Sequence, residues 1–121
     1  KESVKILNDP NIKITATAVR VPVIGGHSES VNLEFNKAFA MEDIYSILHD
    51  TPGVTVVDDP NKNKYPMPID AAGMYDVLVG RIRQDCSRDD KKGIDLFLSG
   101  DQILKGAALN AVQIAEVLIS K

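Results

Sequence analysis

Two stretches near the start of the chain alternate apolar and polar residues. Over residues 12–21, and again over residues 27–35, every second side chain falls on one mostly apolar face. This period of two, together with many β-branched residues, predicts two β-strands. The guanidinium of Arg20 and the imidazole of His27 each continue one of these rows. A charged group on such a face needs a partner, and a bound carboxylate would be one.

The segment between these two predicted strands should be irregular. Pro22 cannot donate a ladder hydrogen bond, and residues 25–26 (Gly-Gly) allow backbone angles that other residues rarely adopt. Upstream, residues 1–7 are predicted to be the end of a helix, which the turn at residues 8–11 (Asn-Asp-Pro-Asn) terminates. We therefore expect an irregular crossing that leads directly to His27.

The rest of the chain predicts strands interrupted by helices. A helix is expected over residues 40–49, with Ile44, Ile47 and Leu48 on one stripe. The later elements are a short strand at 54–57, a long polar loop at 58–68, a strand at 75–83, a charged turn at 85–92, a strand at 94–99, and a helix that Asp101 could cap and that runs to about Ile119. Long loops such as 58–68 are often functional or interfacial. The order predicts an α+β fold with a mainly antiparallel sheet.

Composition excludes several classes of function. The 121 residues allow one modest domain, and 44% hydrophobic with 26% charged residues is ordinary for a globular protein. A net charge of −3, 5% aromatic residues and no tryptophan argue against nucleic acid as a partner. No apolar run approaches the ~20 residues that span a bilayer, so no membrane partner is expected. A single cysteine fits a reducing cytoplasm.

Arg20 and His27 each have a functional and a structural interpretation. Arg20 could clamp a carboxylate with two parallel hydrogen bonds, or it could pair with a nearby acid such as Glu29 or Glu34. His27 could carry out acid–base chemistry near pH 7, or local hydrogen bonds could satisfy it. On pattern alone the structural alternatives are the commoner ones. His49 lies near the end of a predicted helix and is assigned no chemistry.

Three segments resemble the aspartate-semialdehyde dehydrogenases. The first combines Arg-Val-Pro-Val at residues 20–23 with Gly-His-Ser at 26–28. The second combines Tyr-Pro-Met-Pro-Ile-Asp-Ala-Ala-Gly at 65–73 with Val-Gly-Arg-Ile-Arg at 79–83, and the third is Lys-Gly-Ala-Ala-Leu-Asn-Ala-Val-Gln-Ile-Ala-Glu at 105–116. They follow the family's order and span nearly the whole chain. The family's nucleotide-binding half and its nucleophilic cysteine have no counterpart here, so the chain resembles the C-terminal third of the polypeptide.

The resemblance implies a fold, an activity and an assembly. Residues 1–121 would be a C-terminal substrate and dimerisation domain like that of glyceraldehyde-3-phosphate dehydrogenase, with a mainly antiparallel mixed sheet and helices packed on one face. The intact protein would use NADP to convert L-aspartyl 4-phosphate reductively into L-aspartate 4-semialdehyde and phosphate. This step serves lysine, methionine and threonine synthesis. A homodimer or tetramer in the cytoplasm is expected, and the isolated chain should not catalyse.

The resemblance also assigns roles to three residues. Arg20 matches the family's arginine that binds the substrate α-carboxylate, and His27 matches its acid–base histidine. Asn110 matches an asparagine near the nicotinamide of NADP, which the missing half would mainly bind. Asn110 is also an amide within an apolar stripe, for which a hydrogen bond to a neighbouring loop is the alternative. The predicted helix at 101–120 would contact the missing nucleotide-binding domain.

Other polar residues are assigned no catalytic role. Cys86 lies in a net acidic turn and is interpreted as an incidental surface residue. Arg81 and Arg83, which would share a strand face with Val77 and Val79, could bind phosphate, but a structural salt bridge is favoured. The sequence shows no spaced set of metal ligands, no Walker loop and no Gly-x-Gly-x-x-Gly motif.

Two alternative functions stay open. One is a stand-alone, non-catalytic module that dimerises or binds a carboxylate. The other is a related reductase that acts on N-acetyl-glutamyl phosphate, although the segments at 79–83 and 105–110 favour the aspartate enzyme.

Overall fold

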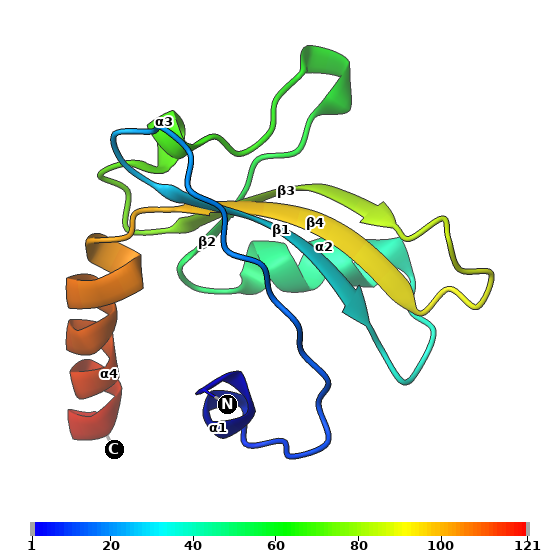
Figure 1. Cartoon of the computed structure of the whole chain (residues 1–121), viewed down its shortest axis with the longest axis horizontal. Helices are drawn as coiled ribbons and strands as arrows, with labels where there is room; N and C mark the ends of the chain where they lie inside the picture. Colours follow the sequence, from blue (N-terminus) through cyan, green and yellow to red (C-terminus); the bar gives the residue numbers. More distant parts are fainter. Residues whose placement is uncertain (1, 121) are drawn as a thin grey trace.

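The structure, a computed structural model that describes residues 2–120, is built on one four-stranded sheet (Figure 1). The elements are α1 (Glu2–Leu7), β1 (His27–Glu34), α2 (Met41–Asp50), β2 (Val54–Val56), the 3-10 turn η1 (Pro60–Lys62), α3 (Pro68–Ala71), β3 (Val77–Gln84), β4 (Gly93–Gly100), the π-helical turn η2 (Leu104–Ala108) and α4 (Leu109–Ile119). The predicted α+β class is confirmed, and most predicted elements lie within two residues of their expected bounds.

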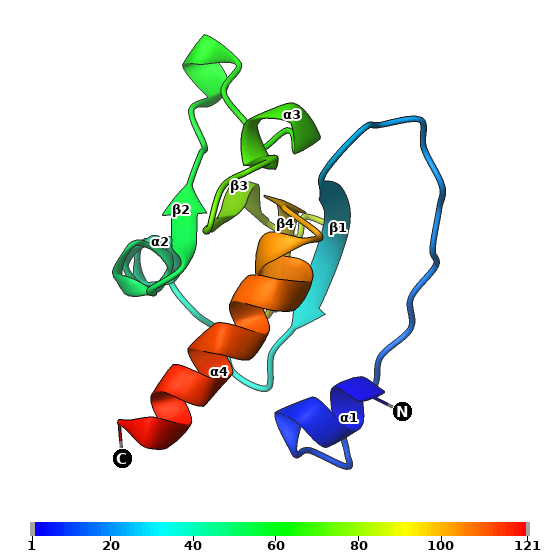
Figure 2. The ribbon, with the colours of Figure 1, turned by 90° about the vertical axis from the view of Figure 1, so that its left-hand side faces the viewer.

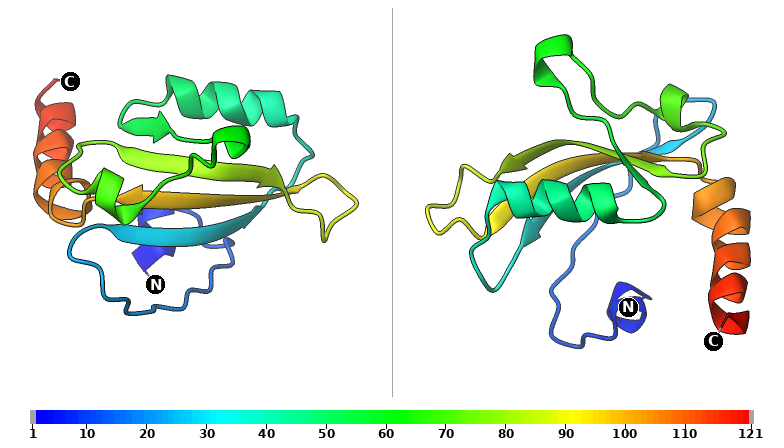
Figure 3. Two further views of the ribbon diagram at one scale, coloured as in Figure 1. Left: turned by 90° about the horizontal axis from the view of Figure 1, so that it is seen from above. Right: turned by 180° about the vertical axis from the view of Figure 1, so that it is seen from behind.

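The sheet is mixed and mainly antiparallel, as expected. Its strand order is β1-β4-β3-β2, and both β1 and β3 run antiparallel to β4. Strand β2 runs parallel to β3 and forms the opposite edge. The charged turn at residues 85–92 joins β3 to β4 where a hairpin was predicted, and Figure 3 shows it at the far end of the sheet from α4.

Helix α2 closes the core on one face of the sheet. Val79, Ile82 and Ile94 are buried there, beneath side chains of α2 and the neighbouring strands. The apolar side chains of α2 that pack on this cluster are Met41, Ile44, Tyr45 and Leu48. Ile47 was predicted to belong to the same stripe, but it is 61% exposed. The spacing of three and four residues between the packed side chains selects Tyr45 instead, because Ile47 turns away to solvent.

The other face is partly covered by the loop at residues 58–68 and by α3, which lie across the sheet from α2 in Figure 1. Ala71 is fully buried, and Pro66 packs on Gly80. A Cβ on Gly80 would lie 2.5 Å from the Pro66 Cδ, so only glycine allows this close approach. The long loop is therefore anchored to the sheet through its final prolines.

The predicted strand at residues 12–21 is wrong. This segment is extended but pairs with no strand among residues 2–120, and most of its side chains are exposed. Figure 2 shows it as an arc that leaves α1 and passes beside β1 before it enters the sheet. Alternation predicts an extended, half-buried segment but does not supply the neighbouring strand that a hydrogen-bonded ladder needs. The apolar row of this segment consequently faces solvent within the described residues.

Helix α4 also stands away from the sheet. It leaves the end of β4 at a steep angle in Figure 1, and none of its residues is buried. Its exposed apolar side chains are Val112, Ile114, Val117, Leu118 and Ile119. No helix within residues 2–120 is long and apolar enough to cross a membrane.

Candidate functional site

His27 is the first residue of β1, and the backbone before it is tightly constrained. His27 pairs with Gly100 of β4 across the ladder and is exposed. The preceding residue, Gly26, is buried and has a φ of +86°. A Cβ at Gly26 would lie 2.8 Å from the Pro68 carbonyl oxygen, so glycine is required on steric and conformational grounds. The prediction that the glycine pair adopts backbone angles rare in other residues is confirmed at Gly26.

Asp101 and Gln102 join this backbone to the start of the last helix. The Gly26 N–H donates a 2.6 Å hydrogen bond to Gln102 Oε1. The Gly73 N–H, which follows α3, donates to Asp101 Oδ2 over 2.8 Å. Three elements that lie far apart in the sequence therefore meet at the C-terminal end of β4.

Asp101 also caps the last helix, as predicted. The Ile103 and Leu104 N–H groups donate to Asp101 Oδ1 over 2.7 and 2.8 Å. The hydrogen bonds from the Gly73, Leu104 and Ile103 amides lower the pKa of the Asp101 carboxyl. The first turn is π-helical, because the Gly106 N–H reaches back to the Asp101 carbonyl. The expected cap is thus present, but on a widened turn.

Arg20 lies in the extended arc and not on a strand. Its side chain is exposed, and it makes no ion pair with any residue among 2–120. The structural alternative, a pair with Glu29 or Glu34, is not formed, and Glu34 instead contacts Arg88 over 3.1 Å. Within the described residues the Arg20 guanidinium is open to an anion, while its role remains a prediction.

Asn110 is the second residue of α4 and is exposed. It follows Gly106, Ala107 and Ala108, which are also exposed and present little side-chain bulk. Among residues 2–120 its amide makes no hydrogen bond to a neighbouring loop, the alternative considered for it. Its contact with a cofactor remains a prediction.

A β-bulge changes the surroundings of Arg81 and Arg83. The register of β3 shifts between Gly80 and Arg83, and Arg81 has a φ of +52°. Both arginines were predicted to share the face of Val77 and Val79, but the bulge turns them to solvent. Arg83 forms the predicted salt bridge, with 3.4 Å between its Nη2 and Asp95 Oδ2. The Arg81 guanidinium lies 6.0 Å from the Tyr65 ring centroid.

Asp58 holds this bulge, which the sequence did not reveal. Its Oδ1 accepts from the Arg81 N–H over 2.9 Å, and its Oδ2 accepts from the Ile82 N–H over 3.0 Å. The Tyr45 hydroxyl of α2 donates to the same Oδ2 over 2.7 Å. Desolvation, followed by this bond and the negative charge of Asp58, raises the pKa of Tyr45 to about 12. Asp58 therefore links the long loop, β3 and α2.

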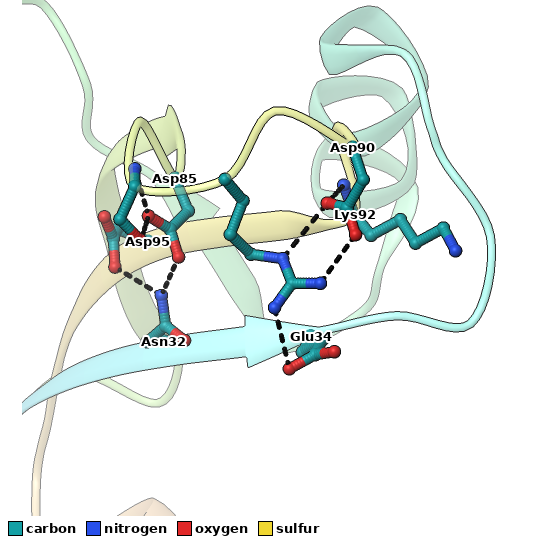
Figure 4. Close-up of polar contacts among 8 residues, drawn as sticks. Asn32, Glu34, Asp85, Asp90, Lys92 and Asp95 are labelled. Carbon is teal, nitrogen blue, oxygen red and sulfur yellow. Dashed lines mark hydrogen bonds and ion pairs between the residues drawn. The ribbon is translucent and has the colours of Figure 1, made fainter.

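The acidic turn between β3 and β4 is internally paired (Figure 4). Asn32 of β1 donates 2.9 Å hydrogen bonds to both Asp85 and Asp95. Hydrogen bonds from Ser87 and then Asn32 lower the pKa of the Asp85 carboxyl. Arg88 binds Asp90 with two bonds and also contacts Glu34 of β1. These contacts fasten the turn to β1.

Two further candidates were a reactive cysteine and a metal site. Cys86 is an exposed free cysteine in the acidic turn, in keeping with a surface residue. Within residues 2–120 no group of three or more histidine, cysteine, aspartate or glutamate side chains could hold a metal ion.

The comparisons with known proteins agree with one another. The family model described as "Semialdehyde dehydrogenase, dimerisation domain" matches residues 1–105. An aspartate-semialdehyde dehydrogenase from Synechocystis is 56% identical over 121 residues, which are 100% of this chain and 35% of that protein. The enzyme of the same name from Bacillus subtilis is 50% identical over 118 residues, or 97% of this chain and 34% of that protein.

Solved structures show the same relationship. Aspartate semialdehyde dehydrogenase II from Vibrio cholerae, complexed with ASA, has a TM-score of 0.90 and 41% identity, covering 99% of this chain and 34% of that chain. Aspartate semialdehyde dehydrogenase from Francisella tularensis has a TM-score of 0.84 and 28% identity, and the match covers 97% of this chain and 33% of that chain. The chain thus spans about a third of the length of these relatives. It belongs to the semialdehyde dehydrogenase family, whose dimerisation domain it contains.

Proposed function

We propose that this chain is the C-terminal part of an NADP-dependent aspartate-semialdehyde dehydrogenase. The observation that carries the proposal is the match of nearly the whole chain to enzymes of that name, at 56% identity for the Synechocystis relative. The intact protein would form L-aspartate 4-semialdehyde and phosphate from L-aspartyl 4-phosphate, on the route to lysine, methionine and threonine. We place it in the cytoplasm, in keeping with its single cysteine.

Arg20 would hold the substrate carboxylate. Its guanidinium is exposed and makes no ion pair within residues 2–120, so a carboxylate would meet no competing acid there. The planar fork can donate two parallel hydrogen bonds, which fix both the position and the orientation of a carboxylate. Orientation matters because the reacting carbon must be held close to the groups that attack it.

His27 would move protons during the reaction. Its position at the start of β1 is set by the ladder pair with Gly100 and by the constrained peptide of Gly26. An imidazole has one nitrogen that can donate a proton and one that can accept it, which suits general acid–base chemistry. We assign it the exchange of a proton with the nucleophilic thiol, and with the oxygen of the tetrahedral intermediate.

The surroundings of Asn110 fit a nicotinamide. Its exposed amide can pair with a carboxamide, and the small residues Gly106, Ala107 and Ala108 leave room for a close approach. When bound, NADPH supplies the hydride for the reduction. Asn110 would contribute to binding and orientation only, since the nucleotide fold lies outside these residues.

The remainder of such an enzyme would cover the exposed apolar surfaces. The arc at residues 12–21 and helix α4 keep apolar side chains in solvent, among them Val19 at 74% and Leu118 at 68% exposed. Exposed apolar surface of this extent is typical of an interface. We propose that α4 contacts a nucleotide-binding domain and that the intact protein is a homodimer or tetramer, in line with the dimerisation domain of the family.

A chimera tests this function. In it, the matching 121 residues of the Synechocystis enzyme are replaced by this chain. With L-aspartate 4-semialdehyde, phosphate and NADP we expect turnover. His27→Asn should reduce kcat by roughly 10²–10⁴-fold. Arg20→Ala should raise KM for the semialdehyde roughly 10- to 100-fold, because a charge-assisted pair is lost. The exposed His49→Asn is the matched control and should behave like the parent.

Other outcomes identify the alternatives. A folded, dimeric chimera without turnover would support a non-catalytic dimerisation or carboxylate-binding module. Preference for N-acetyl-L-glutamate semialdehyde would support the related reductase. Full activity of the His27→Asn chimera would refute the acid–base assignment.

A further inference from the structure

We propose that Gln102 is a positioning residue whose side-chain carbonyl holds the Gly26 peptide and thereby fixes His27 at the start of β1. The Gly26 N–H donates to Gln102 Oε1 over 2.6 Å, across 76 positions of sequence. The inference deepens the proposed function and rests on the catalytic role of His27. It makes Gln102, which lies near the start of the last helix, a residue that supports the proposed catalytic role of His27 on β1.

The Gly26 peptide is confined from two directions. On one side the Pro68 carbonyl and Cα leave room for no Cβ, the nearest approach being 2.8 Å. On the other side the Gln102 amide accepts the N–H of the same residue. Gly26 is buried, so this N–H needs a partner inside the protein. Removing the acceptor would leave the peptide free to rotate toward water, and His27 would follow.

The backbone of Gln102 is itself held firmly. Its neighbour Asp101 accepts hydrogen bonds from the Gly73, Ile103 and Leu104 amides. Two residues before Gln102, Gly100 pairs with His27 in the β1–β4 ladder. The start of β1 is therefore tied to the end of β4 through the ladder, through the 2.8 Å hydrogen bond between the Ser28 and Ser99 hydroxyls, and through the Gln102 side chain.

This tether matters because no side chain among residues 2–120 orients the His27 imidazole through a hydrogen bond. Among residues 2–120 its ring makes no hydrogen bond, and its side chain is exposed. The position of an imidazole without a hydrogen-bond partner depends mainly on the position of its own backbone. A displacement of about 1 Å can reduce turnover on the order of 10²-fold.

The first test uses the chimera described above. Gln102→Leu removes the acceptor at similar volume, and we expect kcat to fall about 10-fold or more while the KM values for the semialdehyde and NADP change less than about 3-fold. Gln102→Glu keeps an acceptor oxygen and should restore most of kcat. Gln113→Leu is the matched control, because Gln113 accepts a 2.6 Å bond from Lys105 on the same helix but lies outside the Gly26 contact.

Two results would overturn the inference. An increase in either KM with kcat unchanged would make Gln102 a binding residue, and equal losses in Gln102→Leu and Gln113→Leu would reduce its role to helix stability. An inactive parent chimera would instead refute the proposed function itself.

A second test needs no activity. In the 121-residue chain, NMR-detected amide exchange at Gly26 should accelerate about 10-fold or more in Gln102→Leu and return in Gln102→Glu, because a lost hydrogen bond exposes the amide. The amide of Leu98, within β4, serves as the internal reference. Unchanged exchange at Gly26 would show that the tether does not exist.

Discussion

Two regions of this chain differ sharply in how they are stabilised. The body, which comprises β1–β4 with α2 and α3, closes its own core, and Ile94 and Val79 are 1% and 3% exposed. The flanks, residues 8–25 and 109–119, leave apolar side chains such as Ile24 and Ile119 almost entirely in solvent. The contacts within the body thus account for its stability. The flanks, in contrast, contain apolar side chains typical of buried segments, but these side chains are exposed to solvent.

The residues proposed for the site follow the same division. Arg20 and Asn110 lie in the two flanks, and His27 lies where the first flank enters the body. Figure 2 shows the arc and α4 as separate from the sheet, with β1 between them. Of the three residues proposed for the site, only His27 is therefore placed by the body, while Arg20 and Asn110 lie on segments that we propose further protein covers.

The largest expected effect comes from the core of the body. Ile94→Ala should lower the free energy of unfolding of the chain by about 2–5 kcal/mol, because it opens a cavity among buried side chains. Ile114→Ala makes the same change on α4, where the side chain is 55% exposed, and should stay within about 0.5 kcal/mol of the parent. Urea unfolding measures the free energy of unfolding of both variants. Equal losses of stability in Ile94→Ala and Ile114→Ala would contradict the difference between body and flanks.

A smaller effect is expected where α2 is joined to the bulge of β3. Tyr45→Phe removes the hydroxyl that donates to Asp58, and should cost about 1 kcal/mol at neutral pH. The pKa of Tyr45 is raised to about 12, so its contribution to stability is complete below the ordinary value near 10 and is lost as the pH rises toward 12.

The pH dependence of unfolding checks this assignment. The difference in stability between the parent and Tyr45→Phe should shrink between about pH 10 and 12. Tyr75→Phe, at an exposed position, should follow the parent throughout. A difference that stays constant over this range would contradict the polar link between α2 and β3.

The smallest effect is expected at the junction of the body and the second flank. The pKa of the Asp101 carboxyl is lowered, so its contribution is present above the ordinary value of about 4 and is lost as the pH falls through the folded value. Asp101→Asn should weaken the cap and speed amide exchange at Gly73 and Leu104 at neutral pH. The difference in exchange rate between Asp101→Asn and the parent should narrow below about pH 4. Asp70→Asn, at an exposed position, is the control and should exchange like the parent.

Local patterns predicted the body well. Alternation located β1, and the helical stripe located α2, although Ile47 was placed on the wrong face. The β3–β4 hairpin and the Asp101 cap were also expected, because their signals lie within a few residues of each other. The local sequence of each of these elements favours the structure it adopts, so no contact with a distant residue is needed to predict it.

The remaining features depend on contacts between distant residues. The alternating segment at 12–21 is extended as its residues prefer, but its pairing depends on a neighbour that the pattern cannot specify. The bulge that exposes Arg81 is held by Asp58, from the preceding loop. Gln102 and Gly26 are separated by 76 positions, and a glutamine has no sequence signal for such a contact.

The contrast between body and flanks is tested most directly by hydrogen–deuterium exchange of the 121-residue chain beside the chimera with the Synechocystis enzyme. We predict that residues 12–25 and 109–119 exchange rapidly in the chain and become protected at least 10-fold in the chimera, while β3 and β4 are equally protected in both. Flanks that are already protected in the chain, or that stay unprotected in an active chimera, would contradict the claim that further protein covers them.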